Sequence, residues 1–315
     1  MMTFSPATYA SEESARKALE AIRWPTGPVC HHCSEDKRRY PTKREGRYRC
    51  GNPKCRRDYT VTTGTVMERS HVPLRKWVEG FAIMCESKKG VSSLELQRHL
   101  KISYKAAWFL SHRIREAMRD GGMKPPPMLG GGGKIVEADE TYFGRTKEAL
   151  PHIRKRYTPY TKSGWKGKGS ARPIVALVER GGSVRTFHVA HADKVTVGGI
   201  VADNIARESR LHTDESRLYT EVGSHFGAHE TVKHSVGEYV RGDVHTNSAE
   251  GYFSIFKRGM KGIYQHCSEK HLHRYVAEFD FRYNNRIALG INDRERAAIA
   301  IKGAEGKRLT YRQAH

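Results

Sequence analysis

The chain has 315 residues, and its 56 lysines and arginines against 34 aspartates and glutamates give a formal net charge of +22. No apolar run approaches the length of a membrane span, which excludes a membrane-spanning protein. The acidic start lacks the apolar core of a secretory signal, which excludes a secreted protein. So large a positive charge repels itself and favours a polyanionic partner, double-stranded DNA first of all, over a membrane. We expect a cytoplasmic, nucleoid-associated protein of two or three domains.

The first predicted domain, residues 1–66, holds a short helix from Glu12 to Ile22 and a cysteine motif. Two cysteine pairs, spaced C-x2-C and C-x4-C with sixteen residues between them, are Cys30, Cys33, Cys50 and Cys55. Four thiolates complete the tetrahedral shell of one structural Zn²⁺. Short alternating runs around these pairs predict strands, so the segment is interpreted as a zinc ribbon that needs the metal to fold.

Residues 67–120 are predicted to form a helical domain of the helix–turn–helix type. Residues 92–100, a short turn and the segment Tyr104–Met118 form the pattern, with Ser103 as the cap of the second helix. The inward-facing positions of this helix would be Ala107, Leu110, Ile114 and Met118, and Trp77, Phe81, Met84 and Cys85 form an earlier apolar stripe.

The basic residues of the second helix suggest a role in binding. Lys105, His112, Arg113 and Arg115 are expected on or near the exposed side, where Lys105 and Arg113 would contact DNA from the major groove. The alternative interpretation is an ordinary three-helix bundle with a basic face.

A Gly/Pro-rich linker at residues 121–133 separates these segments from a domain with alternating strands and helices, residues 134–290. Strands are expected at 135–143, 173–178, 184–190 and 211–214, with helices at 195–207, 218–226, 244–261 and 272–283. This order predicts a mixed α/β layer with an RNase-H-like fold. Residues 291–315 are interpreted as a basic tail.

Between the first two strands of this domain lies a long segment without acids that mixes cations and aromatic residues. Its predicted DNA contacts are Arg154, Lys155, Arg156, Lys162, Lys166 and Lys168. Cations together with Tyr157, Tyr160 and Trp165 suit a DNA backbone and unstacked bases, whereas the alternative is a solvated charged loop.

Two aspartates are candidates for catalysis. Asp139 lies inside an apolar strand, where an ionised side chain is costly unless it is used, and Asp214 ends a second strand. With Glu250 from the helix at 244–261, they form the pattern of a nuclease site that holds two Mg²⁺ ions through carboxylate oxygens. Glu140 is expected on the opposite face of the strand, and His212, His245 and His266 are interpreted as core or surface residues.

The helix at 244–261 is expected to begin with Asn247 or Ser248 as its cap. Asn247, Glu250 and Lys257 fall near one face at a period of 3.6 residues. Lys257, together with Arg258 at the end of the helix, would hold a DNA phosphate.

The chain as a whole resembles bacterial insertion-sequence transposases of the DDE type with an N-terminal zinc ribbon, the IS fifteen-ninety-five family. The cysteines of the ribbon carry this resemblance, together with EADETYFG at 137–144, LHTDES at 211–216, HTNSAEGYFSIFKRG at 245–259 and a block around Glu278 and Arg282. The resemblance implies a polynucleotidyl transferase that binds element ends and target DNA, cleaves the 3′ ends and transfers the strands. It also implies a homo-oligomer on DNA.

Alternatives remain open at three points. The third metal ligand is either Glu250, separated from Asp214 by thirty-five residues, or Asn247, which matches the amide found in several relatives. Glu278 and Arg282, four apart on a helix, form either an intrahelical ion pair that braces the site or part of the catalytic machinery. The rival functions are a DNA-binding regulator with an inactive nuclease domain and an RNase-H-like nuclease without strand transfer.

Overall fold

The computed structural model describes residues 5–120, 126–144 and 172–310, and the chain divides into two compact units. The ribbon–helical unit combines Met1–Pro125 with Ala277–His315, and the sheet unit spans Pro126–Val276. This division differs from the predicted domains. Ribbon and helices share one unit rather than separating at residue 66, and the end of the chain returns to that unit instead of forming a tail.

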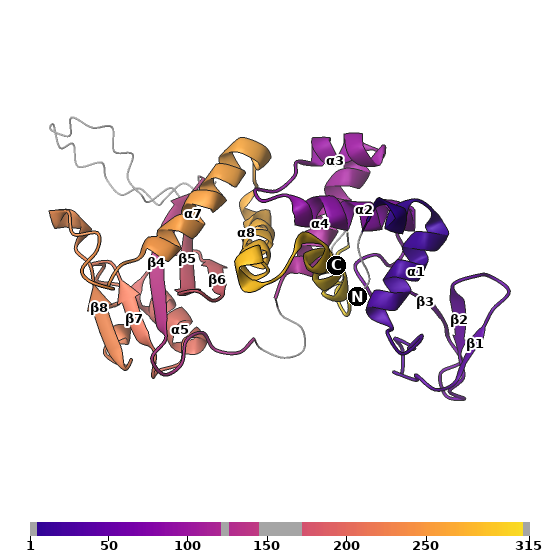
Figure 1. Cartoon of the computed structure of the whole chain (residues 1–315), viewed down its shortest axis with the longest axis horizontal. Coiled ribbons are helices and arrows are strands. Elements are labelled where there is room, and N and C mark those ends of the chain that lie inside the picture. The colour runs from indigo at the N-terminus through magenta and orange to yellow at the C-terminus, as the bar shows by residue number, and fades with distance from the viewer. Residues whose placement is uncertain (1–4, 121–125, 145–171, 311–315) are drawn as a thin grey trace. The chain divides into compact units, whose positions relative to one another are not determined.

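The predicted ribbon and helices are present in the ribbon–helical unit (Figure 1). Its elements are η1 (Pro6–Tyr9), α1 (Glu12–Arg23), β1 (Arg39–Pro41), β2 (Arg47–Cys50), β3 (Asp58–Thr60), α2 (Leu74–Glu86), α3 (Ser93–Leu100), α4 (Tyr104–Met118), η5 (Ile287–Leu289) and α9 (Asp293–Lys302). The three strands form an antiparallel sheet in the order β1-β2-β3. Side-chain caps begin α1, α3, α4 and α9, as predicted for Ser103, whose hydroxyl accepts from the amide of Ala106.

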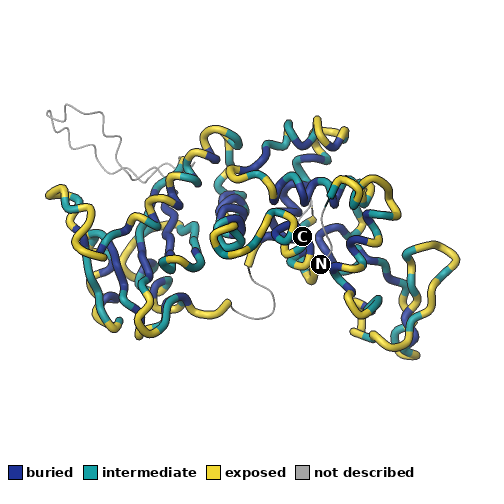
Figure 2. Tube along the Cα trace, in the orientation of Figure 1, coloured by how far each residue is buried: buried dark blue, intermediate teal, exposed yellow. Residues whose placement is uncertain are grey.

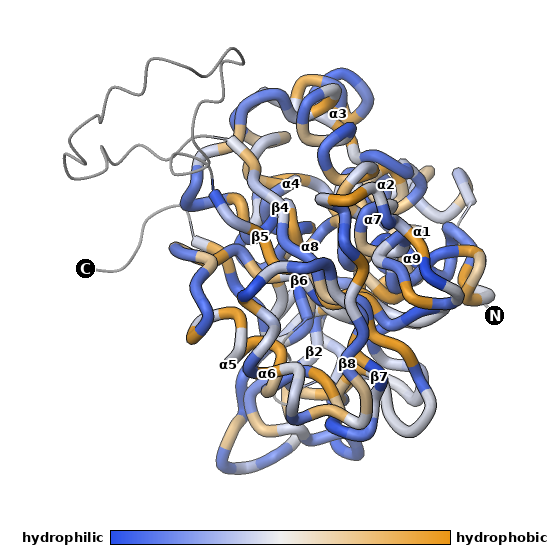
Figure 3. Tube along the Cα trace, turned by 90° about the vertical axis from the view of Figure 1, so that its left-hand side faces the viewer, coloured by the Kyte–Doolittle hydropathy of each residue, from blue (hydrophilic) through white to orange (hydrophobic). Residues whose placement is uncertain are grey.

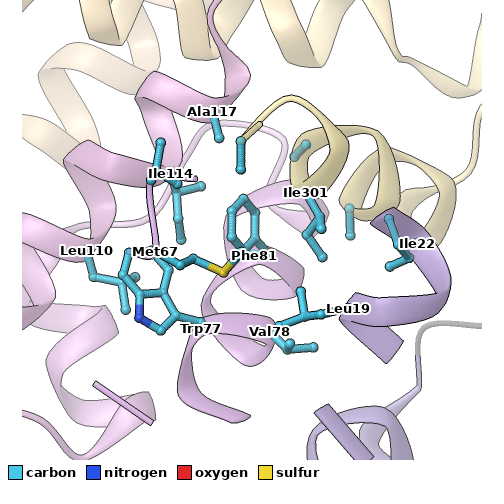
Figure 4. Packing of buried hydrophobic residues seen from close by; sticks show 14 of the residues in the cluster. Leu19, Ile22, Met67, Trp77, Val78, Phe81, Leu110, Ile114, Ala117 and Ile301 are labelled. Atoms are coloured by element: carbon cyan, nitrogen blue, oxygen red, sulfur yellow. The ribbon is translucent and has the colours of Figure 1, made fainter. Parts of the chain in front are cut away.

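One hydrophobic core joins the long helices of this unit, α9 and the strands β2 and β3 (Figure 4). Leu19 of α1, Phe81 of α2, Ile114 of α4 and Ile301 of α9 belong to it. Figure 3 shows hydrophobic and hydrophilic residues alternating along helices such as α1 and α3, as expected for helices that are buried on one side.

The prediction of an exposed basic face on α4 is wrong for most of the helix. Arg113 is only 9% exposed, and its guanidinium donates to the carbonyls of Leu309 and Glu68. His112 and Arg115 are buried as well, whereas Lys105 is exposed near the start of the helix. The helix is covered along its second half because the C-terminal segment packs beside it, which its own periodicity did not reveal.

That C-terminal segment corrects the predicted tail at 291–315. Asn292 caps α9 by accepting from the amides of Arg294 and Glu295. Ala297, Ala300 and Ile301 are buried in the common core. The run Ala297–Ile301 contains the apolar spacing of a short helix, but the surrounding charges concealed it.

Glu278 and Arg282 form the predicted intrahelical ion pair. A second arginine, Arg115, binds the same carboxylate, so the three side chains form a buried ion triad. Arg282 Nη1 lies 2.5 Å from Glu278 Oε1, and Arg115 Nε of α4 lies 2.6 Å from Glu278 Oε2. All three side chains are nearly inaccessible to solvent. The pair therefore belongs to the core of the ribbon–helical unit, where it joins α4 to the end of the last long helix, α8 (Glu269–Asn284).

The four ribbon cysteines converge as a zinc site requires. Their sulfur atoms lie within 4.8 Å of one another, with Cys30 Sγ 3.8 Å from Cys55 Sγ and Cys33 Sγ 3.5 Å from Cys50 Sγ. A tetrahedron with Zn–S bonds of ~2.3 Å has edges of about 3.8 Å, so the donor set fits zinc. Burial raises the pKa of the Cys50 thiol to about 12, which makes a bare thiolate costly there and a metal-bound one favourable.

The sheet unit is built on five strands, four of them predicted. Its elements are β4 (Ile135–Phe143), β5 (Arg172–Glu179), β6 (Val184–His188), α5 (Lys194–Asn204), β7 (Arg210–Thr213), α6 (Thr220–Gly223), β8 (Ala228–Thr231), η3 (His234–Val236), α7 (Asn247–Gly259) and η4, a π-helical turn (Met260–Tyr264). The sheet order is β6-β5-β4-β7-β8. β4, β5 and β6 pair antiparallel, and β7 pairs parallel with β4 and β8.

This topology is the RNase-H-like fold that the order of elements predicted. Figure 2 shows the central strands β4 and β5 as buried or half-buried, because elements pack on both of their faces. The edge strand β8 was missed, since its four half-buried residues show no apolar alternation. Within the described part of the chain, no helix combines the length and the apolar character needed to cross a membrane.

Removal of zinc should unfold the ribbon. We expect Cys33→Ser, or a zinc chelator, to release one Zn²⁺ per chain and to abolish the antiparallel pairing of β1–β3, because this short segment has little core of its own. Zinc content by mass spectrometry of the native protein and amide exchange across residues 30–60 measure both effects. Retained protection in zinc-free protein would contradict the prediction.

Breaking the buried ion triad should destabilise the ribbon–helical unit. We expect Glu278→Ala to lower the free energy of unfolding by about 3–5 kcal/mol, because two buried guanidinium groups lose their shared carboxylate. Denaturant unfolding measures the change, and the exposed pair Lys17–Glu13 supplies a control, since Glu13→Ala removes an ion pair that is open to solvent. A Glu278 variant as stable as this control would refute the structural role.

Candidate active site

The side chains of β4 alternate between the two faces of the sheet. Val136 and Ala138 join the core that contains α5, whereas Phe143 meets Phe256 of α7 with ring centroids 5.5 Å apart. Because side chains alternate along a strand, Asp139 lies on the face that α7 covers. The strand thus carries a carboxylate beneath the helix that was expected to contribute the third acid.

The parallel pairing of β4 with β7 brings the two aspartates to one edge. The register pairs Val136 with Leu211 and Glu137 with His212. Both aspartates follow this paired stretch by two residues, so they lie toward the same, carboxyl end of the two strands. The charge of Asp214 acts on Asp139, whose pKa it raises. Asp214 follows the end of β7, and its Oδ1 accepts from the amide of Ser216 at 2.9 Å, which holds the turn.

A cavity of about 730 Å³ opens at this edge between β4 and α7. Its lining residues from β4 are Asp139, Glu140 and Thr141, and those from α7 and the following turn are Glu250, Phe253, Ser254, Lys257, Arg258, Lys261 and Gly262. One wall is therefore acidic. The other wall begins with the acid Glu250 near the start of α7 and ends with three basic residues, Lys257, Arg258 and Lys261. Such an arrangement suits a cation next to a phosphate.

The carboxyl group of Asp139 shows the electrostatic character of the site. Burial raises its pKa to about 8, with further contributions from the negative charges of Glu140, Asp214 and Glu250. Burial also lowers the pKa of Lys257, and the charge of Asp139 opposes that shift. The three predicted acids and the predicted lysine therefore act on one another electrostatically, and the acids repel one another without a cation.

The neighbouring Glu140 has a different environment, as predicted. Its Oε2 accepts a hydrogen bond from the hydroxyl of Tyr219 at 2.8 Å. Tyr219 belongs to the core on the α5 face of the sheet. Glu140 is thereby tied to the opposite face from Asp139, although it still lines the cavity at the end of the strand.

The helix α7 differs in its start from the prediction. Its N-cap is Thr246 rather than Asn247 or Ser248, and no side chain of the cap residue accepts from the helix. Instead, the buried carboxylate of Glu137 on β4 accepts from the amides of Ser248 at 2.7 Å and Ala249 at 3.1 Å. An acid from a neighbouring strand thus caps the helix.

The two candidates for the third ligand lie in different places. Glu250 lines the cavity and raises the pKa of Asp139, and its Oε1 accepts from the hydroxyl of Thr246 at 3.4 Å. Asn247 is exposed at the first residue of the helix and is not among the residues that line the cavity. Geometry thus favours Glu250 over Asn247 as the neighbour of Asp139.

The predicted DNA-contacting residues fall into four groups. Lys257 and Arg258 line the cavity, and Lys105 is exposed in the other unit. Arg113 is buried and bonded to carbonyl groups. The remaining predicted contacts, which are Arg154, Lys155, Arg156, Lys162, Lys166 and Lys168, lie outside the described residues.

The residues that support the site were not predicted from the sequence. Glu137 entered only as part of the motif at 137–144, and Arg180 was not singled out. His245, interpreted as a core or surface residue, lies with its Nδ1 3.3 Å from Glu137 Oε1. One signal was available: Glu137 and Asp139 share a face of an apolar strand, so two acids there needed two explanations rather than one.

Comparisons with known proteins agree with this architecture. The chain matches the ISXO2-like transposase domain over residues 128–284 and the transposase zinc-ribbon domain over residues 10–58. It is 32% identical over 287 residues to an uncharacterised protein in the transposable element ISH50 of Halobacterium salinarum, covering 87% of this chain and 92% of that protein.

Solved structures resemble the chain only weakly. The simian T-cell lymphotropic virus intasome in complex with the PP2A regulatory subunit B56 gamma is 12% identical, with a TM-score of 0.27 over 59% of this chain and 63% of that one, less than two thirds of its length. The Mos1 strand transfer complex is 12% identical, with a TM-score of 0.23 over 66% of this chain and 76% of that one. Scores this low support no inference about the site.

The sequence matches cover the ribbon and the sheet unit in the order in which the structure arranges them, and the ISH50 relative extends over nearly the whole chain. The chain therefore belongs to the ISXO2-like family of transposases, with the transposase zinc ribbon at its N-terminal end.

Proposed function

We propose that this protein binds the ends of its element in double-stranded DNA, cleaves them with the aid of two Mg²⁺ ions and transfers the strands to a target. The observation that carries the proposal is the cavity between β4 and α7, where acids meet lysine and arginine side chains. Asp139, Asp214 and Glu250 are the proposed metal ligands. The negative charges of Asp214 and Glu250 help to raise the pKa of Asp139. This mutual repulsion fits a site that a divalent cation would neutralise.

The donor set supports Mg²⁺ because all three side chains offer carboxylate oxygens, which hard cations prefer. When bound, the ions supply Lewis-acid activation of the attacking oxygen and stabilisation of the leaving one. Asp139 on β4, Asp214 just after β7 and Glu250 on α7 would hold the ions, so the ligands would keep their positions relative to the sheet.

The basic end of α7 supports contact with DNA. Lys257, Arg258 and Lys261 line the cavity along one side of the helix and its extension, away from Glu250. A phosphate there would be held by ammonium and guanidinium groups while the acidic wall holds the metal. Lys257 is half-buried and electrostatically coupled to Asp139, which makes it the cation best placed to hold the phosphate near the reacting bond.

The ribbon and the exposed start of α4 are the proposed contacts for recognition of the ends. The net charge of +22 supports a DNA partner for the chain as a whole. Two DNA ends must be brought together before strands are joined, and we therefore propose that the protein acts as a homo-oligomer on DNA.

Loss of the central acid should abolish cleavage while leaving DNA binding intact. We expect Asp139→Asn to reduce Mg²⁺-dependent nicking by at least about 10³-fold, because a metal ligand that contributes several kcal/mol of transition-state stabilisation is lost. The substrate is a supercoiled plasmid that carries the gene between its native flanking DNA, with nicks mapped by primer extension. Gel shifts on the same flanking DNA measure binding.

The same assay separates the two candidates for the third ligand. Glu250→Gln should be as inactive as Asp139→Asn, whereas Asn247→Ala should retain nicking within about tenfold. The reverse result would transfer the role to Asn247. Unimpaired nicking by Asp139→Asn would overturn the proposed site, and nicking without joined products would leave a nuclease that does not transfer strands.

Metal binding should become tighter as the pH rises toward 8. Below a pKa of about 8 the metal-free carboxyl group of Asp139 holds a proton, which a metal must displace. We therefore expect the affinity for Mn²⁺, used as a probe in place of Mg²⁺, to rise by up to about tenfold per pH unit between pH 6 and 8 and to level off above.

Electron paramagnetic resonance of free Mn²⁺ measures this affinity. In Asp139→Asn the affinity should be weaker, and its dependence on pH should be shallower, because the titrating group is gone. An equally steep dependence in that variant would assign the proton to another group and contradict the prediction.

A further inference from the structure

Glu137 is an acid that the proposed chemistry does not use. It lies on β4, its side chain is fully buried, and its carboxylate accepts hydrogen bonds from two other segments of the sheet unit, the start of α7 and the turn at Arg180. Oε2 accepts from the amides of Ser248 and Ala249, and Oε1 accepts from the hydroxyl of Ser248 at 2.9 Å. Arg180 adds Nε at 3.0 Å and Nη2 at 2.8 Å, both to Oε1.

These contacts explain how the charge is tolerated inside the protein. An isolated buried carboxylate is strongly unfavourable, and it persists only when it is paired and hydrogen-bonded. Arg180 supplies the opposite charge, and the first amides of α7 supply donors that the helix itself leaves unbonded. The helix dipole adds a favourable interaction at the same point. Each donor of α7 thereby gains its partner only when the helix is docked on β4.

The contact between Glu137 and the start of α7 lies close to the proposed metal ligands. On β4, Glu137 precedes Asp139 by two residues and shares its face of the strand. On α7, Ser248 and Ala249 immediately precede Glu250. The capping contact therefore lies directly beside two of the proposed metal ligands and sets the height of α7 along β4, where one helical residue corresponds to ~1.5 Å.

Arg180 also donates hydrogen bonds to the segment that leads into α7. Its Nη1 donates to the carbonyl of Asp243 at 2.8 Å, and its Nη2 donates to the carbonyl of His245 at 3.3 Å. Asp243 in turn accepts from Arg210 of β7 at 2.7 Å. The entry to the helix is thus tied to β7, the strand that ends at Asp214.

We propose that Glu137, held by Arg180, is a positioning residue that sets α7 against β4 and so brings Glu250 and Lys257 into register with Asp139. The inference rests on the proposed metal site and names the groups that maintain its geometry. Glu137 itself touches neither metal nor DNA. A shift of ~1 Å among such groups is enough to lose about a hundredfold in rate, so a cap at this place controls activity without taking part in it.

The test replaces the charge while keeping the shape. In Glu137→Gln one carboxylate oxygen becomes an amide nitrogen, which faces either the Arg180 donors or the α7 amides and repels them. We expect the Mn²⁺ dissociation constant of the metal-binding site to rise about 10–100-fold, as is usual when a group that orients metal ligands is changed. Free Mn²⁺ measured by paramagnetic resonance on the full-length protein gives this constant without any DNA.

Two further readouts separate positioning from general stability. Amide exchange should accelerate at residues 248–250, the first turn of α7, in the folded variant. Nicking of the plasmid should fall in parallel with Mn²⁺ affinity and recover partly at high Mg²⁺ concentration. A merely structural role would lower the melting temperature while leaving the Mn²⁺ affinity of the folded protein unchanged.

A matched control is available on the next strand. Glu179 of β5 accepts from Lys134 at 2.9 Å and from the amide of Gly130 at 2.9 Å, and it does not line the cavity. Glu179→Gln removes a paired carboxylate from the same unit, yet we expect its Mn²⁺ affinity to stay within twofold of the native protein.

Milder variants keep the proposal testable if Glu137→Gln fails to fold. Ser248→Ala removes one hydrogen bond to Oε1, and Arg180→Lys keeps the charge while losing the paired donors. Each should weaken Mn²⁺ binding by about 3–10-fold, and their effects should not add when the two are combined, because they act on one carboxylate.

The outcomes distinguish this inference from the proposed function. If Asp139→Asn abolishes nicking while the folded Glu137, Ser248 and Arg180 variants keep native Mn²⁺ affinity, only the positioning role is overturned. If Asp139→Asn keeps both nicking and Mn²⁺ affinity, the metal site itself is refuted. Weakened Mn²⁺ binding in Glu137→Gln with a native value in Glu179→Gln supports the positioning role.

Discussion

The carboxylate of Glu137 at the start of α7 is the constraint on which the candidate site depends. It joins a strand, a helix and a hairpin turn through hydrogen bonds of 2.7–3.1 Å to the helix amides and an ion pair to Arg180 at 2.8 Å. Because the group is fully buried, none of these partners is replaceable by water. Helix and sheet are therefore docked by a polar contact as well as by apolar packing such as that of Phe143 on Phe256.

Two acids on one face of β4 thus have opposite electrostatic environments. Glu137 is surrounded by donors and a guanidinium group, whereas Asp139 faces other carboxylates and has its pKa raised to about 8. The first arrangement is complete within the protein, and the second is unfavourable until a cation arrives. The contrast distinguishes an acid that maintains structure from one that is available for chemistry, although the two are separated by a single residue.

Buried charged groups in the ribbon–helical unit are likewise paired with opposite charges or placed to bind a metal. The guanidinium groups of Arg115 and Arg282 share the carboxylate of Glu278, and the four converging cysteines fit a zinc ion that would hold them as thiolates. In this unit the charges stabilise connections between segments that are distant in the sequence. The C-terminal helix α9 completes the core around α4, and the second half of α4 is buried there.

Local signals in the sequence determined the ribbon, most helices, four of the five strands of the sheet and the identity of the candidate acids. Cysteine spacing, helix caps such as Ser103 and apolar periodicity are properties of neighbouring residues, and they were sufficient for these elements. Only the tertiary structure decided which of the candidate residues lie close together in the site. The parallel register of β4 with β7 brings Asp139 to Asp214, the phase of α7 turns Glu250 rather than Asn247 into the cavity, and long-range packing buries Arg113 and α9. These outcomes depend on pairing and docking between distant segments, which hydrophobic period and residue spacing do not encode.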